Sequence, residues 1–168
     1  MKIRHLLLAL LIAPLSMMAQ SKIAVFDSQA IFSVMPEKAA AEAQLKSLSD
    51  QYHAEYELLK SEFDKKYADY QALATDPSTP ATIRDRRMQE VQQGDKKIQE
   101  FQQSASEEIA MQREALMKPL VDAIAAAVTE VGQEGGYDLI LDTSRTAVAF
   151  TGPAVTDITA QVKAKLGL

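Results

Sequence analysis

The chain has 168 residues, and its 18 basic and 23 acidic side chains give a formal net charge of −5. It contains no cysteine, which excludes disulfide bonds, thiolate catalysis and cysteine metal sites. The length predicts one domain, and the acidic balance argues against nucleic acid as a partner.

Residues 1–19 have the features of a secretory signal peptide. Basic residues precede an apolar run over 6–15, and small residues follow up to Ala19. The apolar run is too short to span a bilayer. We therefore expect cleavage after about Ala19 and an exported mature chain with 16 basic and 23 acidic side chains, a net charge of −7.

Residues 20–36 begin the predicted body. A strand over 22–26 carries apolar residues on both faces, which is typical of a strand that is covered on both sides. Asp27 is expected to cap a short helix over 28–34. That helix should end before Pro36, because helical geometry is disfavoured for the residue that precedes a proline.

The longest predicted element is an arm of two antiparallel helices over 37–118, with its tip at 75–80. Apolar residues of the first helix recur every three or four positions, as on one face of a helix. At 1.5 Å per residue, each helix would reach roughly 55–60 Å. The returning helix has fewer apolar residues and contains Gly94, so we expect the distal half to bend and splay.

Residues 119–168 complete the predicted body. Pro119 is expected to kink the chain, and a further helix should end at Gly135 and Gly136. Two strands are predicted over 137–142 and 146–150, joined by a short turn, and Thr156 is expected to cap a last helix.

Three strands leave two open edges, so several copies are expected to close a shared β-barrel. The body residues expected to mediate this oligomerisation are Ile23, Val25, Phe26, Leu139, Leu141, Val148 and Phe150.

Segments at both ends of the mature chain together resemble a known family. These segments are 22–32 (KIAVFDSQAIF), 35–37 (MPE), 136–142 (GYDLILD), 147–150 (AVAF) and 157–159 (DIT). They are similar to the Skp/OmpH family of periplasmic chaperones. The resemblance implies an α+β fold and a jellyfish-like homotrimer, in which long helical hairpins project from a shared barrel around a cavity. It also implies an ATP-independent holdase that binds unfolded outer-membrane proteins there and prevents their aggregation.

One departure from the family concerns charge. The best-known members are basic, whereas this chain is acidic, and residues 64–90 carry five basic and five acidic side chains. Contact with a membrane or with lipopolysaccharide is therefore left open.

The aromatic stripe of the first arm helix allows two interpretations. Its residues can pack between the two helices, which is the commoner role of an apolar stripe. Alternatively, part of the stripe faces the cavity together with methionines, whose flexible side chains suit varied clients. The candidate client-binding residues are Tyr52, Tyr56, Phe63, Tyr67, Tyr70, Met88, Met111 and Met117.

The sequence predicts no catalytic residue, no cofactor and no metal site. Four aspartates of the body are interpreted as structural residues at helix starts and strand positions: Asp27, Asp138, Asp142 and Asp157. The alternative function is a structural helical-hairpin adaptor or spacer of the cell envelope that binds one folded partner. Such an adaptor requires a continuous, well-packed arm.

Overall fold

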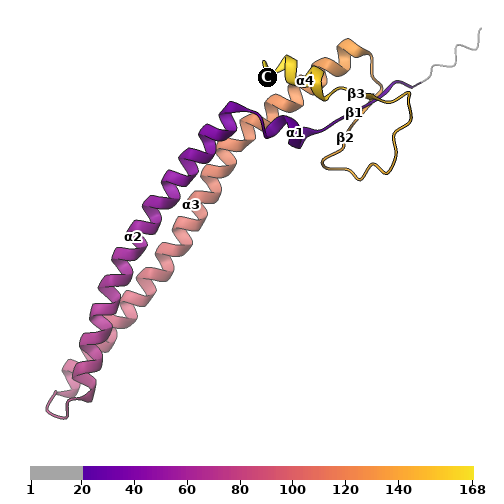
Figure 1. Cartoon of the computed structure of the whole chain (residues 1–168). Helices are drawn as coiled ribbons and strands as arrows, with labels where there is room; N and C mark the ends of the chain where they lie inside the picture. The colour runs from indigo at the N-terminus through magenta and orange to yellow at the C-terminus, as the bar shows by residue number, and fades with distance from the viewer. Residues whose placement is uncertain (1–20) are drawn as a thin grey trace, which may run out of the picture.

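The computed structural model describes residues 21–168, so the predicted signal peptide and its cleavage site lie outside the described residues. Figure 1 shows a small body at one end of a long helical hairpin. Long helices with one small sheet confirm the predicted α+β class.

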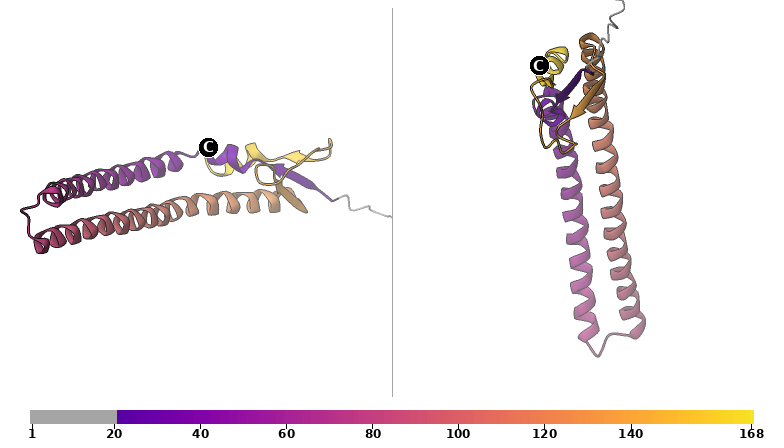
Figure 2. Two further views of the ribbon diagram at one scale, coloured as in Figure 1. Left: turned by 90° about the horizontal axis from the view of Figure 1, so that it is seen from below. Right: turned by 90° about the vertical axis from the view of Figure 1, so that its right-hand side faces the viewer.

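The hairpin consists of α2 (Pro36–Thr75) and α3 (Ala81–Gly135), which lie side by side and antiparallel (Figures 1 and 2). Pro36 stands at the start of α2, where its missing N–H leaves no helical bond unmade. At the tip, the Asp76 carboxylate accepts hydrogen bonds from the Ser78 backbone N–H at 2.9 Å and from the Thr79 hydroxyl at 3.3 Å. These bonds fix the tight turn between the helices.

Helix α3 is one helix from the tip to Gly135, so the prediction of a separate body helix after Pro119 is wrong. A proline removes one backbone hydrogen bond, and the burial of Leu120 and Ile124 against the body holds the following turns in place. The helix ends at Gly136, whose φ of 61° favours glycine. The N–H of Tyr137 then donates to the carbonyl of Gly132 at 3.0 Å, as in a Schellman motif.

The sheet joins the two ends of the chain. Strand β1 (Ile23–Phe26) lies in the centre, between β2 (Leu139–Asp142) and β3 (Thr156–Asp157), and both pairings are parallel. Neighbouring parallel strands require a long crossover connection. Between β1 and β2, that connection contains the short helix α1 (Ser28–Phe32) and the whole arm.

The predicted strand over 146–150 is wrong, because the third strand is β3. After β2, the Thr143 N–H bonds the carbonyl of Phe26 at 2.8 Å, so the chain turns toward β1 and does not fold back along the open outer edge of β2. Residues 146–150 follow as an unpaired loop in which Phe150 is 84 % exposed. The last helix, α4 (Thr159–Lys165), begins after β3 and is not capped by Thr156.

The core of the body lies between the sheet, α1, α3 and α4. Ala24, Ile31, Ile158 and Val162 have no exposed surface. The side chains that α3 contributes recur at helical spacing, so that one face of this helix covers the core: Leu120, Ile124, Ala127 and Val131.

Asp142 ties the end of β2 to the start of α1. Its carboxylate accepts hydrogen bonds from the backbone N–H and hydroxyl of Ser28, at 3.2 and 2.5 Å, and from those of Ser144, at 3.0 and 2.7 Å. Partial burial disfavours the ionised carboxylate, but these hydrogen bonds outweigh it and hold the pKa of Asp142 below its ordinary value.

Because the pKa of Asp142 is lower in the folded chain, its ionisation stabilises the fold above the unfolded value of about 3.9. This contribution is lost as the pH falls through the folded pKa. We expect Asp142→Asn to lower the free energy of unfolding at pH 7 by about 1–3 kcal/mol. Thermal melts at pH 7 and pH 2 should show a smaller loss on acidification for the variant than for the parent. Equal losses would contradict this role of Asp142.

Candidate functional site

The two arm helices meet along the predicted aromatic stripe. Leu45 of α2 and Ala105 of α3 are buried at this contact, and the rings of Tyr52 and Phe101 meet edge to face with centroids 5.9 Å apart. The packing interpretation therefore applies to the half of the arm nearest the body.

In the distal half of the arm, Gly94 lets the two helices approach closely. The expected splaying therefore does not occur where Gly94 faces α2. A Cβ atom at Gly94 would lie 3.2 Å from Cδ2 of Phe63, which shows that the ring rests against the helix where the glycine has no side chain. The same ring stacks on Tyr67 at 6.0 Å between centroids. The glycine that sequence reasoning interpreted as a weak point is a packing position.

Gly94→Leu should lower the free energy of unfolding of the arm by about 1–2 kcal/mol. Leucine gains helix propensity of about 1 kcal/mol, but its side chain must displace the Phe63 ring. Helicity followed during thermal unfolding measures the change. The exposed neighbour provides the control, since Gln93→Leu meets no such ring. An equal effect of both substitutions would show that Gly94 has no special packing role.

The eight candidate client-binding residues differ in exposure. Tyr67, Met88 and Met111 are exposed, whereas the others are partly buried: Tyr52, Tyr56, Phe63, Tyr70 and Met117. The partly buried residues fit the packing interpretation, whereas client binding by the three exposed residues stays a prediction.

A shallow groove of about 380 Å³ runs along one side of the arm, between the two helices. Its lining combines tyrosines and His53 from α2 with Phe101, Gln102 and Ser106 from α3, and contains no Asp, Glu, Lys or Arg. Such side chains combine apolar surface with hydroxyl and amide groups that both donate and accept hydrogen bonds.

Helix geometry places this groove on the side of the arm that faces the body. Eighteen residues make about five full turns, so Met88, Ser106 and Ile124 of α3 point in the same direction. Ile124 packs into the core of the body. On α2, Tyr67 follows Ser49 by eighteen residues, so these two side chains also point in the same direction. Ser49 lines the groove. We call the side that carries Ser49, Tyr67, Met88 and Ser106 the body-side face.

Met111 lies on another side of the arm. It follows Ser106 by five residues, about 140° around the helix, and lines a separate hollow with Lys118 and Asp122. Leu58 follows Ser49 by nine residues and so points about 180° away from the groove. The three candidate methionines are therefore not brought together, because Met117 and Met88 lie toward the body-side face and Met111 does not.

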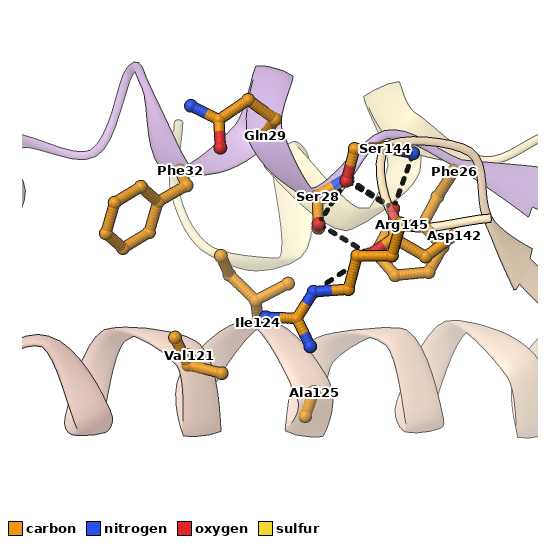
Figure 3. Close-up of a pocket in the computed structure, with 10 residues that line it drawn as sticks. All are labelled: Phe26, Ser28, Gln29, Phe32, Val121, Ile124, Ala125, Asp142, Ser144 and Arg145. Atoms are coloured by element: carbon orange, nitrogen blue, oxygen red, sulfur yellow. Dashed lines mark hydrogen bonds and ion pairs between the residues drawn. The ribbon is translucent and has the colours of Figure 1, made fainter. Parts of the chain in front are cut away.

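The predicted oligomerisation residues are unequally exposed in the body. Val25 is buried, Leu139 and Phe150 are exposed, and the others are half-buried: Ile23, Phe26, Leu141 and Val148. A cavity of about 360 Å³ opens beside them, between α1 and α3. Figure 3 shows its apolar end at Phe32 and Val121 and its polar end at the Asp142 network.

The family model described as Outer membrane protein (OmpH-like) matches residues 22–166. The chain belongs to the OmpH-like family. A crystal structure of a candidate outer membrane chaperone (OmpH-like) from Caulobacter crescentus CB15 aligns with a TM-score of 0.69 and 22% sequence identity, covering 88% of this chain and 85% of that chain. This likeness shows a shared fold. No curated protein matches this OmpH-like chain.

The acidic residues of the OmpH-like body have structural partners. Asp27 caps α1 by accepting the N–H of Ala30 at 2.8 Å, as predicted. The Asp138 carboxylate accepts a hydrogen bond from the backbone N–H of Lys22 at 2.7 Å. The Asp157 carboxylate accepts one from the backbone N–H of Thr159 at 2.8 Å. Within residues 21–168, no group of three or more metal-binding side chains is found, and no helix is long and apolar enough to cross a membrane.

Sequence reasoning missed the α3 side of the groove in this OmpH-like arm. Gln102 and Ser106 are polar and carry no apolar signal, although the eighteen-residue spacing from Met88 through Ser106 to Ile124 is visible in the sequence. That spacing, more than the apolar stripe, indicates which residues share a side with the body.

Proposed function

We propose that this OmpH-like protein is an ATP-independent holdase chaperone of the periplasm that binds unfolded outer-membrane proteins. The observation that supports this most is the arm itself, which presents aromatic and methionine side chains in contact with solvent far from the body's core. Large exposed apolar side chains on an otherwise charged surface are typical of binding sites. The predicted signal peptide and the family support the location.

The body is proposed to join with other copies into a trimer around a shared barrel. The exposed side chains of Leu139 and Phe150 support this, as do the outer edges of β2 and β3, which meet no further strand among the described residues. Residues 147–150 of the unpaired segment alternate small and large apolar side chains, so this segment is suited to add a strand once a second copy supplies an edge.

The proposed mechanism needs no nucleotide. Each contact between a client and an arm is weak, but several arms around one cavity keep the client at a high effective concentration. The enclosed client is kept apart from other unfolded chains, which slows aggregation. Folding into the membrane removes the exposed surface that the arms bind, and this releases the client.

Light scattering tests this function. An outer-membrane β-barrel protein unfolded in urea is diluted with and without the mature chain at one trimer per client. We expect the chain to suppress the rise in scattering. An unchanged rise, with a folded mature chain confirmed by circular dichroism, would contradict the holdase.

One observation favours the adaptor as a second candidate. Both arm helices are continuous, and Gly94 closes their packing in the distal half, as a rigid spacer requires. Crosslinking in cells separates the two functions. Many crosslinked outer-membrane clients support the chaperone, whereas one dominant folded partner supports the adaptor.

A further inference from the structure

The body-side face of the arm has little net charge. Its groove is lined by aromatic, amide and hydroxyl side chains, with Tyr67 and Met88 exposed further toward the tip. Lys60 lies eleven residues after Ser49 and therefore shares this face, but its ammonium group pairs with Asp64 at 2.6 Å. Asp95 and Arg113 of α3 also lie within about 20° of the direction of Ser106, so acidic and basic side chains are balanced in number on this face.

The opposite face of the arm is acidic in its middle part. Counting 100° per residue from Ser49 and Ser106 places four glutamates and one lysine there over 51–62 and 97–111: Glu55, Glu62, Glu100, Glu108 and Lys97. This face also exposes Leu58 and Met111. Apolar side chains are therefore accessible on both faces, and the faces differ mainly in charge.

Joining through the bodies decides which face looks inward. The body packs on the side of α3 that carries Ile124, and Met88 and Ser106 point the same way. If several copies join through their bodies, their symmetry axis therefore lies on the body side of each arm. The neutral groove would line the cavity, and the acidic face would be turned outward.

We propose that the body-side face holds the client, and that it does so without attraction between net charges. The inference rests on the function proposed above and names the surface and the chemistry of its substrate. The occupant is an extended, uncharged and aromatic-rich segment of an unfolded polypeptide. Tyrosines provide large contacts at a low cost in conformational entropy, and Gln102 and Ser106 can bond unpaired backbone groups of the client.

The acidic face is unsuited to this occupant. A segment without positive charge gains no electrostatic attraction from Glu55, Glu100 and Glu108, and acidic segments are repelled. Outward-facing glutamates instead keep the loaded assembly soluble. Salt should therefore have little effect on client affinity. At 1 M salt, charge–charge interactions are screened beyond about 3 Å, whereas apolar contacts persist.

Two double variants with the same replacement residue test the assignment. Tyr67→Ser with Met88→Ser changes the body-side face, where these residues are 44 % and 46 % exposed. Leu58→Ser with Ile83→Ser is the control away from this face, with exposures of 68 % and 45 %, because Ile83 precedes Met88 by five residues and so points about 140° away from it. The chain has no tryptophan, so the tryptophan fluorescence of a urea-unfolded outer-membrane protein reports client binding alone.

We expect the body-side variant to lose about tenfold or more in client affinity and the control to stay within about twofold of the parent. Affinity should also change less than about threefold between 0.1 and 1 M salt. Circular dichroism melts confirm that both variants fold. A larger loss in the control, or a tenfold loss of affinity in salt, overturns the assignment while the chaperone function stands. Absence of binding by the parent chain overturns both.

Discussion

Ile158→Ala is expected to lower the free energy of unfolding of the body by about 2–5 kcal/mol. Ile158 has no exposed surface and packs with Ala24, Ile31 and Val162 in the core of the body. Its N–H also donates to the carbonyl of Val25 at 2.9 Å, which extends the pairing of β3 with the central strand. Shortening this side chain to alanine leaves a cavity where the segment after β3 packs against β1.

A small domain has about 5–15 kcal/mol of stability in total, so this loss should unfold a large part of the body at moderate denaturant concentrations. Urea titration of the mature chain, followed by circular dichroism and by native mass, measures it. Leu168→Ala is the control, because Leu168 is exposed at the end of the chain. Equal midpoints for the two variants would contradict the placement of Ile158 in the core.

Phe150→Glu should abolish self-association and leave the single chain folded. In the isolated chain the side chain is in contact with solvent, and substitution of such a residue changes stability by about 0.5 kcal/mol or less. Inside a shared barrel, the same carboxylate would be buried without a partner. That costs several kcal/mol, which corresponds to a hundredfold or greater loss of association at about 1.4 kcal/mol per factor of ten.

Sedimentation of the parent and the variant at the same concentration separates these effects. Leu58→Glu adds the same charge at an exposed apolar position of the arm and should leave the assembly intact. An unchanged native mass for Phe150→Glu would show that segment 146–150 takes no part in the interface.

The arm could be predicted from the sequence because its signals are local. Pro36 starts α2, the apolar spacing marks one helical face, and the glycine at 136 ends α3 with a left-handed residue. Each signal acts within a few residues, so neighbouring sequence contains the needed information.

The third strand and the arrangement of the site depend on distant residues. The segment 146–150 has the composition of a strand, but the bond from Thr143 to Phe26 turns the chain away from β2, and no local pattern reveals such a distant partner. Gly94 was interpreted from its helix propensity alone, whereas its role comes from Phe63 on the other helix. The separation of Met111 from Met88 needed the direction of each helix face relative to the body.

The shared base is tested most directly by the native mass of the mature protein, measured by light scattering on a size-exclusion column. A mass three times that of the chain, independent of concentration over the micromolar range, is the predicted result. A folded single chain over the same range would contradict a cavity enclosed by several arms.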